Sequence, residues 1–201
     1  MALFSYVVAR DYGFAPNPFG GFCTLATCKP DIRHAAQVGD WVIGTGCAER
    51  HRTGYLVYAM KVAETLTFDQ YWFDPRFQHK KPDLRASKKL AFGDNIYHHE
   101  NSGWVQADSH HSYPGGIPNE ENIETDTKFD RVLVATEFAY WGGAGPAIPA
   151  RLRDYQGHDL CAGRGFKRHF PMEMETEFVT WLGSLQAQGY IGRPLDWSRT
   201  P

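Results

Sequence analysis

The residues best suited to acid–base chemistry in this sequence are histidines in two adjacent pairs. One pair lies at positions 98–99, and the other, His110 and His111, follows Asp108. Histidine is the usual general base near neutral pH, and a carboxylate beside it can fix its tautomer. The pattern predicts an acid–base site in which His110 or His111 acts with Asp108 or Asp11. Because neighbouring residues of a strand point to opposite faces, each pair can offer one ring to a shared site. A two-histidine metal site, structural histidines and phosphate-contacting histidines are the alternatives.

The cysteines are few and scattered, at positions 23, 28, 47 and 161. This pattern does not indicate a disulfide scaffold, so we expect free thiols. Four residues separate Cys23 from Cys28, a spacing that some zinc sites use, but Cys47 and Cys161 are isolated and do not complete such a site. We therefore expect no bound metal and no cofactor.

Aromatic rings beside glycine-rich or polar segments predict a second kind of site. Tyr12 and Phe14 lie in the loop 11–21, Trp41 opens a predicted strand, and Trp141 precedes two glycines. Stacking of a base on an aromatic ring contributes roughly 1–3 kcal/mol. These four rings predict a pocket for a flat base. The alternative is that the rings, Phe14 and Trp41 in particular, pack a hydrophobic core.

Polar side chains near these rings could recognise the edge of a base. Asp11 and Asn17 lie in the loop 11–21, Thr45 lies near the end of a predicted strand, and Asn95 and Tyr97 lie in the segment 93–99. Asparagine, aspartate and hydroxyl side chains carry the donors and acceptors that such recognition needs. For Asp11, Asn17 and Asn95 the alternative is ordinary turn chemistry.

A basic stretch at residues 76–89 is the candidate for phosphate contacts. It carries one acidic residue and six basic residues, which are Arg76, Lys80, Lys81, Arg85, Lys88 and Lys89. Lysine and arginine contacts to phosphate drive much of nucleic-acid binding. The alternative is a solvated loop.

Length and composition indicate one globular domain over residues 1–201. The 201 residues are 42% hydrophobic and 22% charged, with a net charge of −2, which excludes bulk disorder and indiscriminate coating of DNA. Residues 1–9 have no basic region before their apolar run, so we expect no signal peptide, no membrane association and a cytoplasmic protein. Known signatures for phosphate-binding loops, dinucleotide sites, zinc deaminases and nucleophile elbows do not match.

The residue patterns predict an α+β or mostly-β fold with one small curved sheet or a β-barrel, short helices and a C-terminal amphipathic helix. Predicted strands lie at 2–9, 23–28, 41–46, 54–65, 93–99, 103–113, 131–136 and 138–141. Helical segments are expected at 31–36, 68–73 and 173–188. The two strands at 41–46 and 54–65 should form a hairpin at the centre of the sheet.

Six segments carry a family resemblance: SYVVARDYGFAPNPFGGFCTLATCKP (5–30), VGDWVIGTG (38–46), GYLVYAMKV (54–62), GDNIYH (93–98), DSHHS (108–112) and YWGG (140–143). They resemble the family called nucleotide modification associated domain, type 2, over about residues 3–145. The resemblance leaves residues 146–201 as a C-terminal extension. It implies a setting in bacterial or phage systems that modify nucleic-acid bases, including phage defence, more than it implies a reaction.

The order of elements is also similar to that of PUA-like domains of the EVE and ASCH kind, in which Gly-Asp opens the strand after the first helix. That similarity implies a module that binds nucleic acid and holds a modified base in an aromatic cage, although fold alone does not determine function. Three hypotheses follow: a module that recognises a base or nucleotide, an enzyme that alters one with a His/Asp acid–base site, and a subunit that docks a partner nuclease or modification enzyme.

Overall fold

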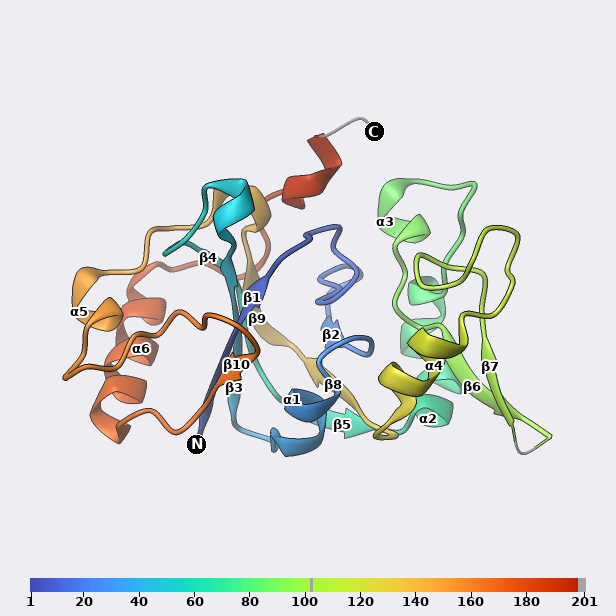
Figure 1. Ribbon diagram of the computed structural model, residues 1–201, viewed down its shortest axis with the longest axis horizontal. Helices are drawn as coiled ribbons and strands as arrows, with labels where there is room; N and C mark the ends of the chain where they lie inside the picture. Colours follow the sequence, from blue (N-terminus) through green and yellow to red (C-terminus); the bar gives the residue numbers. More distant parts are fainter. Residues whose placement is uncertain (102, 199–201) are drawn as a thin grey trace. The chain divides into compact units, whose positions relative to one another are not determined.

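The computed structural model describes residues 1–101 and 103–198, which fall into two compact units (Figure 1). Unit 1 contains residues 1–11, 36–62 and the chain from residue 136 onward, and unit 2 contains residues 12–35 and 63–135. Each unit is therefore assembled from separate stretches of sequence.

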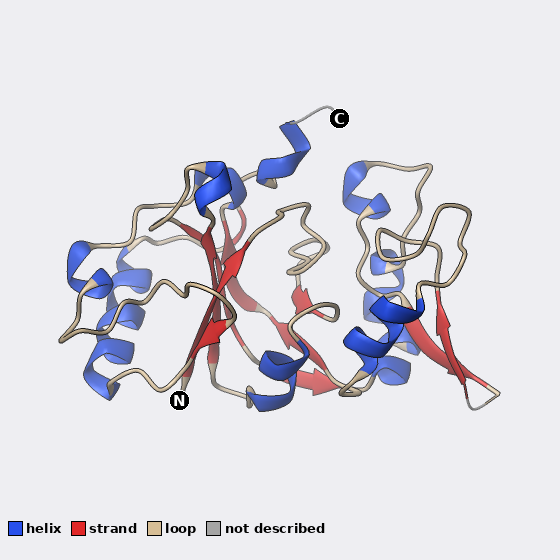
Figure 2. Cartoon of the chain, viewed as in Figure 1, coloured by secondary structure: helices blue, strands red, loops and turns tan. Residues whose placement is uncertain are grey.

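Unit 1 is built on an open sheet of six strands (Figure 2). Its strands, in spatial order, are β10 (Phe166–Lys167), β1 (Leu3–Val8), β3 (Trp41–Gly46), β4 (Leu56–Lys61), β9 (Glu137–Tyr140) and β11 (Gly189–Tyr190). β1 and β3 are parallel, β4 is antiparallel to both β3 and β9, and β11 runs parallel to β9. The predicted hairpin of β3 and β4 is confirmed and occupies the centre of this sheet.

Helix α6 (Met172–Ser184) packs its apolar stripe against unit 1's sheet. The predicted helix is confirmed, although it ends at Ser184 rather than at residue 188. Phe178 and Trp181 join Trp41 and Ile43 in one hydrophobic core, with the rings of Trp41 and Phe178 6.4 Å apart. The shorter helical elements of this unit are α5 (Ala150–Arg153), η1 (Ala48–Arg50), η3 (Gly142–Ala144) and η4 (Leu195–Ser198).

Unit 2 contains two small sheets and most of the short helices. One sheet has the order β2 (Cys23–Leu25), β8 (Val132–Ala135) and β5 (Glu64–Leu66), and the other pairs β6 (Tyr97–Glu100) with β7 (Gly103–Gln106). The helices are α1 (Pro30–Ala35), α2 (Phe68–Phe73), η2 (Pro75–Lys80), α3 (Lys88–Ala91) and α4 (Glu120–Thr127). The sequence predicted α2 correctly because Thr67 and Gln70 form the expected capping box.

Three expectations about the fold need correction. The six-stranded sheet is open, with β10 and β11 at its edges, so the described residues contain no closed barrel. The segment 54–65 is not one strand, because the backbone changes partners after Val62: its N–H bonds Asp40, whereas that of Ala63 bonds Val134. The single sheet expected from the sequence is instead three separate sheets among the described residues. The helix α4 was not predicted. In addition, no helix among the described residues is both long and apolar enough to cross a membrane.

A candidate cysteine–histidine–aspartate site

Cys28 lies in a tight connection of unit 2, between strand β2 and helix α1. Its backbone is left-handed, with φ 56°, and so is that of Lys29, with φ 43°. For residues other than glycine this conformation costs roughly 1–2 kcal/mol each. Two buried side chains hold Cys28 in it: its N–H donates to Asp126 Oδ1 at 2.6 Å, and its carbonyl accepts from Arg33 Nε at 2.9 Å. The turn and its partners thus fix the backbone from which the thiol projects.

Arg33 organises the backbone around this cysteine. The side chain is 0% exposed and donates to the carbonyl oxygens of Cys28, Asp126, Phe129 and Arg131. A guanidinium carries five N–H donors in a rigid plane, which suits it to joining several carbonyl groups. Arg33 therefore ties the segment that carries Cys28 to the C-terminal end of α4, which carries Asp126.

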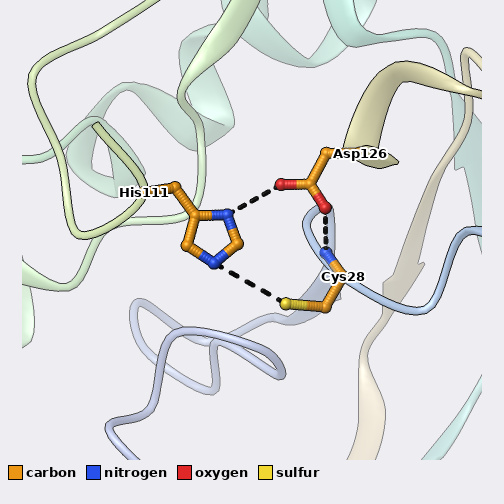
Figure 3. A group of neighbouring side chains, drawn as sticks. All are labelled: Cys28, His111 and Asp126. Atoms are coloured by element: carbon orange, nitrogen blue, oxygen red, sulfur yellow. Dashed lines mark hydrogen bonds and ion pairs between the residues drawn. The ribbon is translucent and has the colours of Figure 1, made fainter. Parts of the chain in front are cut away.

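His111 lies between the acid and the thiol (Figure 3). Its Nδ1 is 2.8 Å from Asp126 Oδ2, and its Nε2 is 3.8 Å from Cys28 Sγ. An ionised carboxylate only accepts hydrogen bonds, so Nδ1 carries a proton and Nε2 is left to exchange one with the sulfur. Asp126 Oδ2 also accepts from the Tyr97 hydroxyl at 2.9 Å, which fixes the carboxylate in turn. We call Cys28, His111 and Asp126 the relay.

The electrostatics of the relay favour a charged imidazole. Burial alone would lower the pKa of His111, but its hydrogen bonds to Asp126 and Cys28 outweigh burial and raise the pKa to about 10. Asp126 is 1% exposed, while Cys28 and His111 are half-buried. An imidazolium beside a thiol is the arrangement that generates a thiolate nucleophile in cysteine enzymes.

The same three residues are the one group of metal-type donors that lies close together within the described parts of the chain, with the ligand atoms within 4.8 Å of one another. His111 directs a different nitrogen to each partner, Nδ1 to Asp126 and Nε2 to Cys28, and Asp126 also bonds the Cys28 N–H, so the three residues form a closed triangle (Figure 3). The use of separate nitrogens is what proton transfer between the carboxylate and the thiol through the imidazole requires.

Aromatic rings of unit 2 pack around the neighbouring His110, and one of them, Phe14, also contacts His111. The Tyr12 and Phe92 rings are stacked, with centroids 5.0 Å apart and planes 10° apart, and His110 lies edge-on to both. Phe14 contacts both histidines, with its centroid 4.6 Å from that of His111. His110 is exposed, Tyr12 and Phe92 are half-buried, and Phe14 is buried. We call Tyr12, Phe14, Phe92 and His110 the ring cluster.

The structure separates the histidine candidates. His111 is placed with Asp126 rather than with Asp108, whose Oδ1 instead accepts from Ser112 Oγ at 3.1 Å. Both His110 and His111 lie in a turn after β7, not in a strand, so their rings are not forced to opposite faces. His98 and His99 each have a local carboxylate, at 3.0 Å, from Glu100 and Asp69 respectively.

The predicted aromatic and polar residues divide between the units. Tyr12 and Phe14 belong to the ring cluster of unit 2, whereas Trp41 and Trp141 pack in the core of unit 1, at 5% and 7% exposed. In unit 1, Thr45 Oγ1 donates to a backbone carbonyl at 3.3 Å.

Asp11, also in unit 1, is 4% exposed and accepts from the Tyr140 hydroxyl and from the Leu195 N–H. Its oxygens help to hold the last described residues of the chain against the end of β1.

The polar candidates of unit 2 are buried in hydrogen-bond networks. Asn17 Oδ1 accepts from Lys80 Nζ at 2.6 Å, and Asn95 Nδ2 donates to two backbone carbonyls. Tyr97 is 0% exposed and supports Asp126. Of these residues only Tyr97 is in direct contact with the relay's carboxylate.

The basic stretch divides into internal and exposed residues. Arg76 pairs with Asp74 and Glu64, Lys81 lies 3.8 Å from the Trp72 ring centroid, and Lys80 is 1% exposed. Burial lowers the pKa of Lys80 to about 8, and its ammonium group donates to Asn17, Phe22 and Thr24. Arg85, Lys88 and Lys89 are the exposed members, and the Lys89 ammonium group lies 5.9 Å from the Phe19 ring centroid.

Sequence reasoning missed two members of the relay. The spacing of Cys28 from Cys23 suggests only half of a zinc site, although a cysteine directly before Lys-Pro, where a helix begins, sits at a constrained turn. Asp126 is not among the residues that the sequence predicts for a site. Recognition of Asn119 as an N-cap would have predicted the helix and placed Ile123 and Asp126 on one face, both of them buried.

Comparison with known proteins identifies the family. The model of the family described as nucleotide modification associated domain 2 matches residues 1–201, so it also includes the stretch 146–201 that the sequence resemblance had left outside. No curated protein and no solved structure matches the chain, and the similarity to PUA-like domains stays a prediction. On the match over its whole length, the chain belongs to the nucleotide modification associated domain 2 family.

Proposed function

We propose that this protein is a cysteine-dependent enzyme of nucleotide modification. Cys28 is the nucleophile, His111 is the general acid and base, and Asp126 orients His111 and stabilises its charge. The observation that carries the proposal is the position of the imidazole, 2.8 Å from the carboxylate on one side and 3.8 Å from the sulfur on the other. Nucleophile, base and orienting acid in this order are typical of covalent catalysis.

The other cysteines lack this combination of exposure and partner. Cys23 is 0% exposed, and Cys47 and Cys161 are 8% and 7% exposed. Burial raises the pKa of Cys23 and of Cys161, which keeps these thiols protonated. Cys28 is half-buried and has an imidazole at its sulfur. We therefore expect Cys28 to be the reactive thiol of the folded protein.

The family match and the ring cluster support a nucleotide or a nucleic-acid base as the substrate. Half-buried Tyr12 and Phe92 and exposed His110 provide flat surfaces next to the relay, and flat surfaces are what a base stacks on. The exposed Arg85, Lys88 and Lys89 are the candidates for phosphate contacts. In this proposal the aromatic recognition and the acid–base chemistry predicted from the sequence belong to one site.

The test is the alkylation of the native protein with iodoacetamide, followed by mass mapping of the modified peptides. We expect one fast modification, at Cys28, and a rate that falls about tenfold or more in His111→Gln. Cys47→Ala is the matched control and should alkylate like the parent protein. Slow alkylation of Cys28 at the rate of an ordinary thiol, unchanged in His111→Gln, would refute the proposal.

A second candidate is a binding module that recognises a modified base without altering it. The ring cluster favours this function as well, since stacking needs no nucleophile. Titration with nucleotides and with single- and double-stranded oligonucleotides that carry unmodified, 5-methyl and 5-hydroxymethyl bases, at two salt concentrations, separates the candidates. A pure binding module loses affinity in Tyr12→Ala, keeps it in Cys28→Ala and consumes no substrate.

A further inference from the structure

The backbone N–H of Cys28 already donates a hydrogen bond within the protein. In acyl transfer by a serine or cysteine nucleophile, an oxyanion forms beside that residue, and the nucleophile's own N–H commonly donates to it. Here the N–H donates to Asp126 Oδ1 at 2.6 Å, and the same carboxylate positions His111. Turning the N–H toward a substrate would disturb the group on which the base depends. The site is therefore poorly prepared for an acyl carbonyl.

The buried guanidinium of Arg33, next to the relay, likewise donates its hydrogen bonds to groups of the protein itself. The Arg33 guanidinium is 0% exposed and donates to four backbone carbonyls, so its charge and donors serve the protein itself. It does not offer a fork to a carboxylate of the substrate, which is how arginine usually recognises that group. Arg33 thus offers no recognition group to a substrate carboxylate beside Cys28.

The surfaces that reach the catalytic imidazole are aromatic. Phe14 contacts the His111 ring at 4.6 Å, and the His110 ring packs against Tyr12, Phe14 and Phe92. Flat rings close to a nucleophile position another flat ring by stacking. A nucleobase stacked on the accessible rings of this cluster would lie beside His111, whose Nε2 faces the sulfur.

We infer that Cys28 adds to a ring carbon of a pyrimidine base, at the carbon–carbon double bond conjugated with a ring carbonyl. This inference rests on the proposed function and names its substrate class. The thiolate sulfur forms a bond to C6, the π pair of the C5–C6 bond moves toward C5 and the carbonyl, and the proton of His111 Nε2 passes to C5. A thiolate and an imidazolium become a neutral adduct and a neutral imidazole, and elimination reverses the step. Neither an oxidant nor a reductant is required.

The experiment uses a 5-nitropyrimidine deoxynucleotide, as the free monophosphate and within a single-stranded oligonucleotide, because the nitro group stabilises the adduct. The readouts are the loss of the near-ultraviolet absorbance of the nitropyrimidine and an intact-mass increase equal to the probe. We expect a one-to-one adduct at Cys28 with at least one of the two probes. We expect no adduct in Cys28→Ala.

Matched variants test the role of the ring cluster. Tyr12→Ala should slow adduct formation about tenfold, which corresponds to the loss of one stacking contact. Phe73→Ala removes an aromatic side chain that is 67% exposed in α2 and should form the adduct at the parent rate. Equal effects of the two changes would overturn the role given to the ring cluster.

The outcomes distinguish this inference from the proposed function. Fast alkylation of Cys28 that depends on His111, together with acylation by p-nitrophenyl acetate and no adduct with either probe, would overturn the inference and leave the proposed function intact. An adduct on a residue other than Cys28 would also overturn it. Loss of the His111 dependence of alkylation would refute the proposed function itself.

Discussion

Each unit contains a buried aspartate, and the two aspartates accept hydrogen bonds from similar donors. In unit 1, Asp11 accepts from a tyrosine hydroxyl and a backbone N–H, and its own N–H bonds Asp196 at 2.7 Å. In unit 2, Asp126 also accepts from a tyrosine hydroxyl and a backbone N–H. Asp126 differs because it accepts in addition from His111, whose other nitrogen faces a half-buried sulfur.

The difference shows what separates a structural carboxylate from a candidate catalytic one. The hydrogen bonds described for Asp11 lead to chain segments that it holds in place, including the start of η4. One hydrogen bond of Asp126 likewise holds a chain segment, at the Cys28 N–H, but another leads through the His111 imidazole to the Cys28 sulfur. Burial and hydrogen-bond satisfaction are common to both residues. What distinguishes them is that the hydrogen bonds of Asp126 continue through a titratable side chain to a thiol.

The largest effect should come from a matched pair of isosteric substitutions, Asp126→Asn and Asp11→Asn. An amide at position 126 can present an N–H to His111 Nδ1 and thereby favour the wrong tautomer, so alkylation of Cys28 should fall about tenfold or more. Asp11→Asn should lower the free energy of unfolding by about 1–3 kcal/mol without changing that rate. Iodoacetamide kinetics and urea denaturation of both variants measure these effects. Similar changes in Cys28 reactivity would contradict the contrast drawn between the units.

An effect of another kind, on stability and not on reactivity, should appear in the pH dependence of the free energy of unfolding. The pKa of His111 is raised from 6.5 to about 10 in the folded protein, so its protonated form stabilises the fold. This contribution is fully present below pH 6.5 and is lost as the pH rises through about 10. The difference in unfolding free energy between the parent protein and His111→Asn should therefore shrink over that range, by an amount on the order of a few kcal/mol.

The parent protein must be compared with His111→Asn because Lys80 contributes to the pH dependence of the unfolding free energy with the opposite sign. Its pKa is lowered to about 8, so its burial destabilises the fold below that pH, and the cost disappears as the pH rises toward 10.5. His169→Asn, a change at an exposed residue of unit 1, is the control and should leave the profile of the parent protein intact. A pH-independent difference for His111→Asn would show that the imidazole is not stabilised as a cation.

The smallest effects should come from Tyr97→Phe and Tyr140→Phe. Each change removes one buried hydroxyl that donates to an aspartate, and each should cost about 1 kcal/mol of stability. Tyr97→Phe should leave Cys28 alkylation within about twofold of the parent, since Asp126 keeps the Cys28 N–H and His111 as donors. A large loss of Cys28 reactivity in Tyr97→Phe would show that Tyr97 takes part in activating the thiol and does more than hold Asp126.

The sequence predicted those features that depend on neighbouring residues. The strand at 41–46, the capped helix 68–73 and the amphipathic helix near the C-terminus follow from local patterns and are confirmed. His111 was a candidate because of its residue type. Its partner was not predictable by proximity, since Asp126 lies 15 residues from His111 and 98 from Cys28. Asp108, the nearby carboxylate, bonds Ser112 instead, and only the folded backbone brings the distant one into place.

The interleaving of the two units has a consequence for the order in which they can form during synthesis. Every residue of unit 2 lies within the first 135, whereas unit 1 needs β9, β10 and β11, which begin at Glu137, Phe166 and Gly189. Chains are made from the N-terminus, and compact units can fold as they emerge from the ribosome. The sequence of unit 2, with Cys28, His111 and Asp126, is therefore complete while unit 1 still lacks β9, β10 and β11. The residues of the proposed site can come together before unit 1 has all of its strands.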